Sequence, residues 1–326
     1  MSLARPSRLS LVFPTLLAFT CSAAPPQQGG SLDEVDFADP FVLRDGEAFY
    51  AFGTGAHGKN IQVARSFDLT RWTTLDDALP SLPAWAVRAP GLTWAPSVLR
   101  RADRYVLYYT APDAVSGFQC ISRAVAPRPE GPYVDDSLAP FVCDDQLCGS
   151  IDPSPFVDES GRPHLLWKSD ENAERCRGAA RIWSQALSED GLAVTGARAH
   201  LLTVDRPWEL PLIEGPAMLL DHGQYYLFYS ANWYESADYA IGYATCRGPL
   251  GPCEKVTVDS AVLRSSGSLL GPGGQEFFDD ARGQRWMTYH AWSAPNATYA
   301  AGGARGLRFA RVSFEGGAPS FTRSPR

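Results

Sequence analysis

A similar run of residues recurs five times along this chain: an apolar pair, a polar turn, and then an aromatic-rich stretch that ends in small residues. Successive copies begin roughly 60 residues apart, a period in the range of propeller blades. They begin at Phe41, Ser97, Phe156, Met218 and Phe277. A unit of this length has room for about four short strands. The repeats therefore predict an all-β fold, a five-bladed β-propeller with four-stranded antiparallel blades around a central axis.

The ends of the repeat array indicate how such a propeller closes. A strand near Val35 is expected to pair with the sheet of the last blade, for which residues 307–312 are a candidate, because closure hides the edges of an open array. With 326 residues and 45% hydrophobic content, the chain can bury the core of a large domain. A β-sandwich whose strands merely share composition is the alternative, but the regular spacing of the same turn favours the propeller.

The beginning of the chain has the composition of a secretory signal peptide. Arg5 and Arg8 precede an apolar run, and Ser22-Ala-Ala24 offers small residues for cleavage. Pro14 interrupts the apolar run, which is too short to cross a bilayer, so no stable membrane span is expected. The mature protein is expected to be secreted or periplasmic. A lipid anchor through Cys21 is the less favoured alternative.

Three regions are predicted from these features: a signal peptide at 1–24, a Pro- and Gly-containing linker at 25–31, and a single propeller domain at 32–326. The formal net charge of the whole chain is −7, and it becomes more negative once Arg5 and Arg8 are removed. Such a charge argues against nucleic acid and anionic lipid as partners. A neutral or cationic substrate fits better.

Six cysteines follow the leader, an even number that predicts disulfides in an oxidising compartment. Two of them bracket a short turn and can pair with each other, which leaves three connectivities for the other four. No two have the C-x2-C spacing of a zinc site. The favoured pairs are Cys246–Cys253, Cys120–Cys143 and Cys148–Cys176.

Three carboxylates precede copies of the repeat, each close to a proline: Asp39, Asp152 and Glu214. An acidic residue beside proline usually marks only a turn. Here the neighbours are apolar, and the repeats place the three at equivalent points, so a closed propeller directs them toward one common axis. This coincidence favours a functional site over three unrelated turns.

Two carboxyl groups on opposite sides of a sugar ring are what glycoside hydrolysis requires, because one protonates the leaving oxygen while the other serves the opposite face. In five-fold order Asp39 and Glu214 lie two blades apart, which leaves room for a water molecule and predicts inversion. Asp39 is the candidate general base and Glu214 the candidate general acid. Asp152, in the blade next to Glu214, is the candidate pKa modulator and orienting group, because like-charge repulsion favours a protonated acid.

Aromatic side chains provide candidate sugar-binding surfaces. Trp94 precedes the second copy of the repeat, and Phe41, Trp167 and Trp233 are further candidates for substrate binding. His290 ends the fifth copy, where the innermost strand is expected to line the axis, and is the candidate to hold a central ion or to bond a substrate hydroxyl. A role in the core or at the rim is the alternative for each of these residues.

Taken together, these segments resemble glycoside hydrolase family 43, five-bladed propeller enzymes that act on arabinose- and xylose-containing polysaccharides. The resemblance spans the chain from Asp36 to Phe314. The segments that resemble the family's general base, pKa-modulating aspartate and general acid are Phe37-Ala-Asp-Pro-Phe41, Ser150-Ile-Asp-Pro-Ser154 and Ile213-Glu-Gly-Pro216. Three more matches are Trp72, Trp94-Ala-Pro96 and Tyr289-His-Ala-Trp292.

The resemblance implies that the chemistry needs no cofactor and that a structural Ca²⁺, or a water in its place, lies near His290. Gly274 stands where many members have a histidine after Gly-Pro-Gly. The compact segment from Cys120 to Asp152, and a chain that ends at Arg326 without a further β-sandwich, look more like arabinan-directed members than like the longer xylosidases. The resemblance thus implies a monomeric arabinanase or α-L-arabinofuranosidase acting on plant-type polysaccharide or oligosaccharide.

Three alternatives remain open at this level. A β-xylosidase or galactan-directed hydrolase of the same family is the second choice. A propeller that binds glycans without cleaving them belongs to a different class, and a scaffold for protein partners is a third. The presence of all three carboxylates favours an enzyme, since a binding protein would have no need of them.

Overall fold

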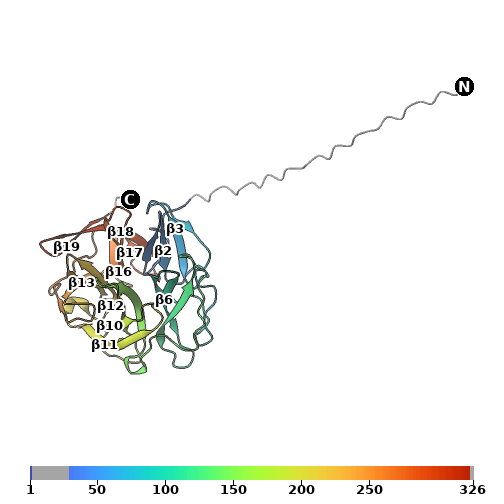
Figure 1. Cartoon of the computed structure of the whole chain (residues 1–326). Helices are drawn as coiled ribbons and strands as arrows, with labels where there is room; N and C mark the ends of the chain where they lie inside the picture. The colour runs from blue at the N-terminus through green and yellow to red at the C-terminus, as the bar shows by residue number, and fades with distance from the viewer. Residues whose placement is uncertain (2–28, 324–326) are drawn as a thin grey trace.

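The computed structural model of the protein describes Met1 and residues 29–323. Five antiparallel sheets surround one axis, and they follow one another around the ring in chain order (Figure 1). This arrangement confirms the predicted five-bladed β-propeller. Cys21, nearly all of the predicted signal peptide at 1–24 and most of the linker at 25–31 lie outside the described residues.

Each blade is a meander whose strands pair in chain order. Blade 1 comprises β1 (Phe41–Asp45), β2 (Ala48–Gly53), β3 (Gln62–Ser66) and β4 (Thr73–Thr74). Blade 2 comprises β5 (Trp94–Arg100), β6 (Tyr105–Pro112) and β7 (Gln119–Ala126). Blade 3 comprises β8 (Ser150–Val157), β9 (Pro163–Ser169), β10 (Arg181–Leu187) and β11 (Val194–Thr203). Blade 4 comprises β12 (Ile213–Asp221), β13 (Gln224–Ala231), β14 (Ala240–Cys246) and β15 (Cys253–Lys255). Blade 5 comprises β16 (Leu269–Asp279), β17 (Arg285–Ser293), β18 (Arg305–Glu315) and β19 (Ala318–Arg323).

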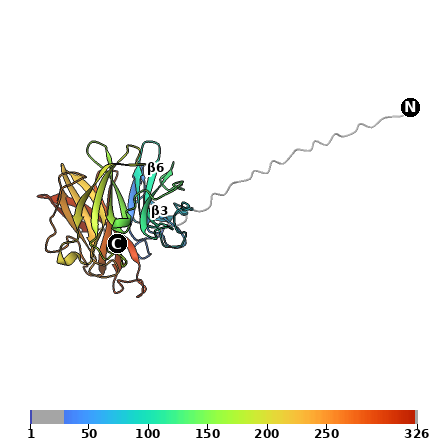
Figure 2. The same cartoon turned by 90° about the horizontal axis from the view of Figure 1, so that it is seen from below.

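The first strand of each blade is the innermost one, because β1, β5, β8, β12 and β16 contact one another in turn around the axis. Blades 1 and 2 lie side by side in both views of the molecule (Figure 2). Blade 2 has three regular strands, and isolated bridges from Ile121 to Val142 and from Val125 to Val134 occupy its fourth edge. The helical turns of the described residues are η1 (Asp145–Leu147) and η2 (Pro207–Glu209), and none of the described helices could cross a membrane.

The ring closes between the N-terminal segment and blade 5, as the repeats predict. Leu307 donates a backbone hydrogen bond to the carbonyl of Leu32 at 2.9 Å, and Phe37 donates one to the carbonyl of Arg305 at 2.9 Å. Residues 32–35 form bends instead of the expected strand. Side-chain hydrogen bonds, such as that from Arg305 N–H to Asp36 Oδ1 at 3.1 Å, and packing between the first and last blades add to this closure.

Hydrophobic packing between neighbouring blades holds the propeller together. Five clusters of buried residues occupy the five interfaces, one between each pair of blades. Strand alternation explains this pattern, because successive side chains point to opposite faces of a sheet. On β6, Leu107 and Tyr109 pack toward blade 1, whereas Val106 and Tyr108 pack toward blade 3. A middle strand is therefore apolar at nearly every position.

Candidate active site

A cavity of about 640 Å³ lies where the innermost strands begin, and residues of all five blades line it. The three predicted carboxylates are among its lining residues. Two predicted aromatic residues, Trp94 and Trp233, also line it. The repeat pattern therefore brings these five residues to one site, although they are spread over nearly 200 residues of sequence.

The backbone at the mouth of each innermost strand has the same irregular conformation. Each blade has a residue with a positive φ at this point, and in four blades it falls at a register shift of the innermost strand; blade 5 has a second one, Gly271. A positive φ is costly for residues other than glycine and is typical of functional sites. These residues are Asp39 (φ 50°), Ala95 (45°), Asp152 (56°), Gly215 (54°) and Gly274 (61°).

This register corrects the prediction that the three carboxylates are equivalent. Asp39 and Asp152 occupy the positive-φ position of their blades, but in blade 4 that position belongs to Gly215. Glu214 precedes it and is equivalent to Trp94 of blade 2 and Ile151 of blade 3. Glu214 therefore approaches the cavity from a different backbone position than the two aspartates.

Hydrogen bonds between neighbouring blades hold these positive-φ residues in place. In four blades the backbone N–H of the positive-φ residue donates to a side chain near the end of the second strand of the preceding blade. The four bonds are Ala95 N to Thr54 Oγ1 (3.0 Å), Asp152 N to Thr110 Oγ1 (3.3 Å), Gly274 N to Ser230 Oγ (2.8 Å) and Asp39 N to His290 Nδ1 (3.1 Å). In the fifth, Gly215 N donates to the Asp152 carboxylate Oδ2 at 2.9 Å. This ring of bonds fixes both aspartates relative to one another.

Asp39 is held as a carboxylate. Thr54 Oγ1 donates to its Oδ2 at 2.6 Å, and the Arg305 guanidinium lies 3.3 Å from its Oδ1. Burial opposes the negative charge of Asp39. The nearby Arg305, together with His290 and the Thr54 hydroxyl, outweighs burial and holds the pKa of this carboxyl below its ordinary value. Asp39 therefore stays ionised over most of the acidic range, as a general base must.

Asp152 on β8 and Glu214 on β12 line the same cavity and interact with each other. Burial, and then the nearby charge of Glu214, raise the pKa of Asp152 to about 8, although Lys168 opposes this shift. Asp152 therefore keeps a proton at neutral pH, beside the Glu214 carboxyl. The two groups can together supply an acid.

Glu214 is oriented by two donors, one on each oxygen. The Lys168 ammonium lies 3.1 Å from Oε2, and the Tyr239 hydroxyl donates to Oε1 at 2.8 Å. The ring of Tyr239 also stacks on that of His290, with centroids 5.9 Å apart and planes 7° apart. His290 in turn accepts the backbone N–H of Asp39. One continuous chain of contacts therefore connects Glu214 to Asp39 through Tyr239 and His290.

Three residues of this arrangement escaped the sequence analysis: Lys168, Tyr239 and Arg305. Lys168 carries a sequence signal, because it is a charge in the otherwise apolar end of a middle strand. Tyr239 and Arg305 carry none, since tyrosines and arginines are frequent in the chain and only the fold brings these two to the axis.

Two predicted substrate-binding residues lie elsewhere. Phe41 is 8% exposed and packs in the core between blades 1 and 2, and Trp167 is 1% exposed in the core between blades 2 and 3. Neither lines the cavity. Both assignments to substrate binding are therefore corrected, because blade packing uses the same large aromatic side chains as sugar stacking does.

His290 is also placed differently from the prediction. It lies on β17, the second strand of blade 5, rather than on the innermost strand. Its side chain still reaches the axis through the space that a side chain at Gly274 would fill, since a Cβ there would lie 2.6 Å from His290 Nδ1. Burial, and then the charge of Arg305, lower the pKa of His290 to about 3, so the ring is neutral at physiological pH.

The neutral ring does not fit a directly bound cation. Its Nδ1 accepts the N–H of Asp39, so the ring hydrogen lies on Nε2, which is buried and has no partner within the described chain. An N–H group donates and cannot ligate Ca²⁺. Within residues 29–323 no three His, Cys, Asp or Glu side chains gather into a metal-binding group. The site fits a hydrogen-bond acceptor such as water.

We therefore expect the thermal stability of the protein to be independent of Ca²⁺. The melting temperature should be the same, within error, after dialysis against a chelator and after addition of millimolar Ca²⁺, because a ligand stabilises only by binding the folded state. Differential scanning calorimetry measures this. A rise of several degrees on adding Ca²⁺, lost when His290→Ala is tested, would show that a cation binds here.

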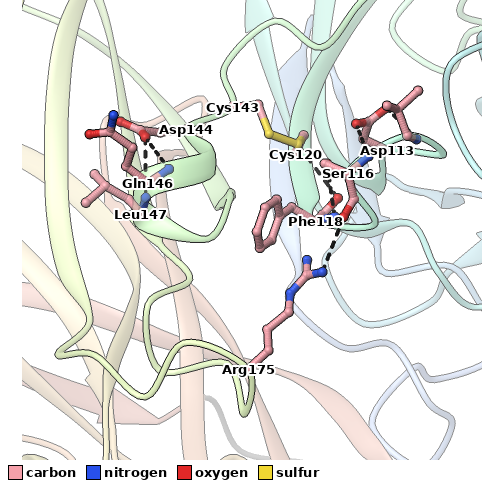
Figure 3. Close-up of a disulfide and its surroundings, with 10 residues drawn as sticks. Asp113, Ser116, Phe118, Cys120, Cys143, Asp144, Gln146, Leu147 and Arg175 are labelled. Atoms are coloured by element: carbon pink, nitrogen blue, oxygen red, sulfur yellow. Dashed lines mark hydrogen bonds between the residues drawn. A yellow bond between two sulfur atoms is a disulfide. The ribbon is translucent and has the colours of Figure 1, made fainter.

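The three predicted disulfides are present: Cys120–Cys143, Cys148–Cys176 and Cys246–Cys253. The second anchors the loop at 170–178, several of whose residues line the cavity. From this loop Arg175 reaches across to blade 2, where it donates to the carbonyl of Ser116 at 3.3 Å and lies 3.5 Å from the ring centre of Phe118 (Figure 3). The loop is thus a fixed wall of the cavity.

Comparison with known proteins gives consistent matches. A profile described as Glycosyl hydrolases family 43 matches residues 33–319. The extracellular endo-α-(1→5)-L-arabinanase 1 of Bacillus subtilis (strain 168) is 26% identical over 283 residues, which cover 80% of this chain and 82% of that protein. A putative β-xylosidase of Xylanibacter ruminicola is 25% identical over 275 residues, which cover 82% of this chain and 47% of that protein. A crystal structure of a thermostable family-43 glycoside hydrolase is similar with a TM-score of 0.79 at 28% identity, over 91% of this chain and 98% of that one.

Proposed function

Because the chain belongs to glycosyl hydrolase family 43, we propose that it is a secreted, monomeric, inverting glycosidase that cleaves arabinose-containing polysaccharide or oligosaccharide. One observation supports this most directly. The cavity is lined by Asp39 of blade 1, whose pKa is lowered, and by the carboxyls of Asp152 and Glu214 from blades 3 and 4, of which Asp152 has a raised pKa. A base and an acid on different sides of one sugar-sized cavity are the groups that inverting hydrolysis needs.

In the proposed mechanism Asp39 is the general base. Its carboxylate takes a proton from a water molecule, whose oxygen attacks the anomeric carbon from the face opposite the leaving group. Arg305 and Thr54 orient this carboxylate before the reaction. They also keep it charged until the water is activated.

Glu214 is the general acid in the same step. It gives its proton to the glycosidic oxygen as the bond from that oxygen to the anomeric carbon breaks. Asp152 shares a proton with it and holds the adjoining backbone through Gly215. At the end of the step Asp39 is protonated and Glu214 ionised, and exchange of one proton with solvent at each side restores the starting state.

Aromatic side chains at the cavity support a carbohydrate substrate. Trp94 and Trp233 contribute from blades 2 and 4, and Trp233 is 45% exposed, so its face is open to a sugar ring. The similarity to the arabinanase covers most of both chains, whereas that to the β-xylosidase covers only 47% of the xylosidase. This contrast favours arabinan over xylan, with a β-xylosidase or galactan-directed hydrolase as the second candidate.

Secretion is supported by three disulfides within the described residues and by the extracellular location named for the arabinanase relative. The signal-like beginning of the chain points the same way. A monomer is proposed because one chain supplies every group of the site.

Product analysis tests the substrate assignment. The protein is incubated separately with linear arabinan, branched arabinan, arabinoxylan, xylan and galactan, and the released sugars are separated by chromatography. Arabinose or arabino-oligosaccharides from arabinan would support the proposal. Release of xylose or galactose alone would favour the second candidate. Binding of a glycan without any product would identify a non-catalytic glycan-binding propeller.

The pH dependence of the reaction follows from the two carboxyl sides. The pair that includes Asp152 loses its proton as the pH rises through about 8, so kcat should fall above this value. Asp39 has a lowered pKa, so the loss of base on the acidic side should begin only below the ordinary range of an aspartate. A pH profile of kcat on arabinan checks both limbs. An alkaline limb that already starts near pH 5 would contradict the coupled pair.

A further inference from the structure

Lys168 is the least expected residue of the site. It lies at the end of β9, its side chain is 2% exposed, and its neighbours along the strand are Trp167 and Ser169. A buried ammonium is costly unless carboxylates surround it. Here the charged form is retained, because the nearby carboxylates outweigh burial and raise the pKa of Lys168 above its ordinary value.

Three carboxyl groups face this ammonium. It lies 3.1 Å from Glu214 Oε2 and 3.2 Å from Asp170 Oδ1, and it also interacts with the charge of Asp152. Asp152 comes from β8, Asp170 follows β9, and Glu214 comes from β12. The ammonium therefore joins blade 3 to blade 4 at the acid side of the cavity.

Two cations line the described cavity, and each belongs to one catalytic side. Arg305 contacts Asp39, the base, and Lys168 contacts Glu214, the acid. The two have opposite chemical consequences. A cation beside the base keeps its carboxylate ionised, so that it can accept a proton. A cation beside the acid favours the ionised carboxylate that is left after the acid has donated its proton.

We propose that Lys168 is a positioning residue of the acid side: its ammonium orients the Glu214 carboxyl and weakens the hold of the Asp152–Glu214 pair on its proton, so that the proton passes readily to the glycosidic oxygen. This inference rests on the proposed role of Glu214 as the acid. It explains why a buried charge is placed at this point of an apolar strand.

The predicted signature is a shift of the pH profile together with a loss of rate. Without the ammonium, the pair holds its proton more tightly. The other titratable groups that interact with the pair are Asp39, Tyr234 and Tyr239, and Asp170 lies on the Lys168 ammonium; none of these replaces the lost positive charge. The alkaline limb of kcat should therefore move up by roughly 1–3 pH units. At pH 7 kcat on arabinan should fall by roughly tenfold or more, because the acid is weaker.

The chain supplies a matched control for this test. Lys255 is 4% exposed and lies 2.7 Å from Glu209 Oε2, and Tyr229 donates to the other oxygen of Glu209 at 2.8 Å. This is the same set of groups as Lys168, Glu214 and Tyr239, but it lies outside the cavity. Lys255→Met should therefore lower stability without moving the pH profile.

The experiment compares Lys168→Met, Lys168→Gln, Lys168→Arg and Lys255→Met with the unaltered protein. The pH profile of kcat is measured on linear arabinan. Carbon-13 NMR of labelled aspartate and glutamate carboxyls follows the titration of the pair without relying on activity, with Asp152→Asn and Glu214→Gln used to assign the signals. Lys168→Gln keeps a donor without the charge and serves if Lys168→Met does not fold.

Upward shifts of both the kinetic limb and the carboxyl titration in the neutral variants, with neither shift in Lys168→Arg or Lys255→Met, are the expected result. An unmoved titration in folded Lys168→Met or Lys168→Gln would overturn the inference, even if stability falls. If the unaltered protein cleaves no glycan, the proposed function fails, yet the NMR titration still decides whether Lys168 sets the proton affinity of the pair.

Discussion

Replacing Asp39 by Asn should abolish hydrolysis of every glycoside that the enzyme accepts, whatever its leaving group. The amide cannot take a proton from water, and activation of the water is needed in each case. We expect a loss of at least roughly 10²- to 10⁴-fold in kcat on both arabinan and an aryl arabinofuranoside. Steady-state kinetics on the two substrates measure this.

A second carboxylate serves as the control for this substitution. Asp158 is buried and lies 3.1 Å from His164, but it is outside the cavity. Asp158→Asn should therefore keep its activity while losing some stability. If Asp39→Asn retains more than a tenth of the activity on either substrate and is folded, Asp39 is not the base.

Replacing Glu214 by Gln should separate the two substrates. Gln has no proton to give to the glycosidic oxygen, so activity on arabinan should fall by roughly 10²- to 10⁴-fold. An aryl glycoside with a good leaving group needs little protonation, so its hydrolysis should be much less affected. The ratio of the two losses, measured as kcat/KM, is the quantity to compare.

Glu209→Gln is the matched control, because Glu209 has a lysine and a tyrosine as partners just as Glu214 does. It should leave both activities near those of the unaltered enzyme when it is folded. Equal losses on the two substrates for Glu214→Gln would show that this residue does not act as the acid.

The fold could be predicted from the sequence because its repeat is long and its period is regular. Strand alternation and the recurring turn determine both the blade and its order in the ring. The spacing of the cysteines determined only the Cys246–Cys253 pair, and the other two observed pairs were the favoured one of three open connectivities. What the sequence did not reveal is that the closing segment at 32–35 forms bends and that blade 2 lacks a fourth regular strand.

The three carboxylates were found because each stands near a proline at the start of a repeat. Their exact equivalence was wrong, since the positive-φ position that Asp39 and Asp152 occupy belongs to Gly215 in blade 4, and Glu214 stands one residue before it. Which residue takes that position depends on φ angles, which residue names do not show. The aromatic assignments failed for Phe41 and Trp167 because burial, not residue type, separates a core ring from a sugar-binding ring.

The stereochemistry of the first product tests the central claim most directly. Linear arabinan is incubated with the enzyme, and proton NMR spectra are recorded before mutarotation equilibrates the anomers. A base on one side of the sugar and an acid on the other predict that the newly formed reducing ends appear first as the β-anomer, inverted from the α-linkage of the substrate. First appearance of the α-anomer would mean retention, and would contradict the roles assigned to Asp39 and Glu214.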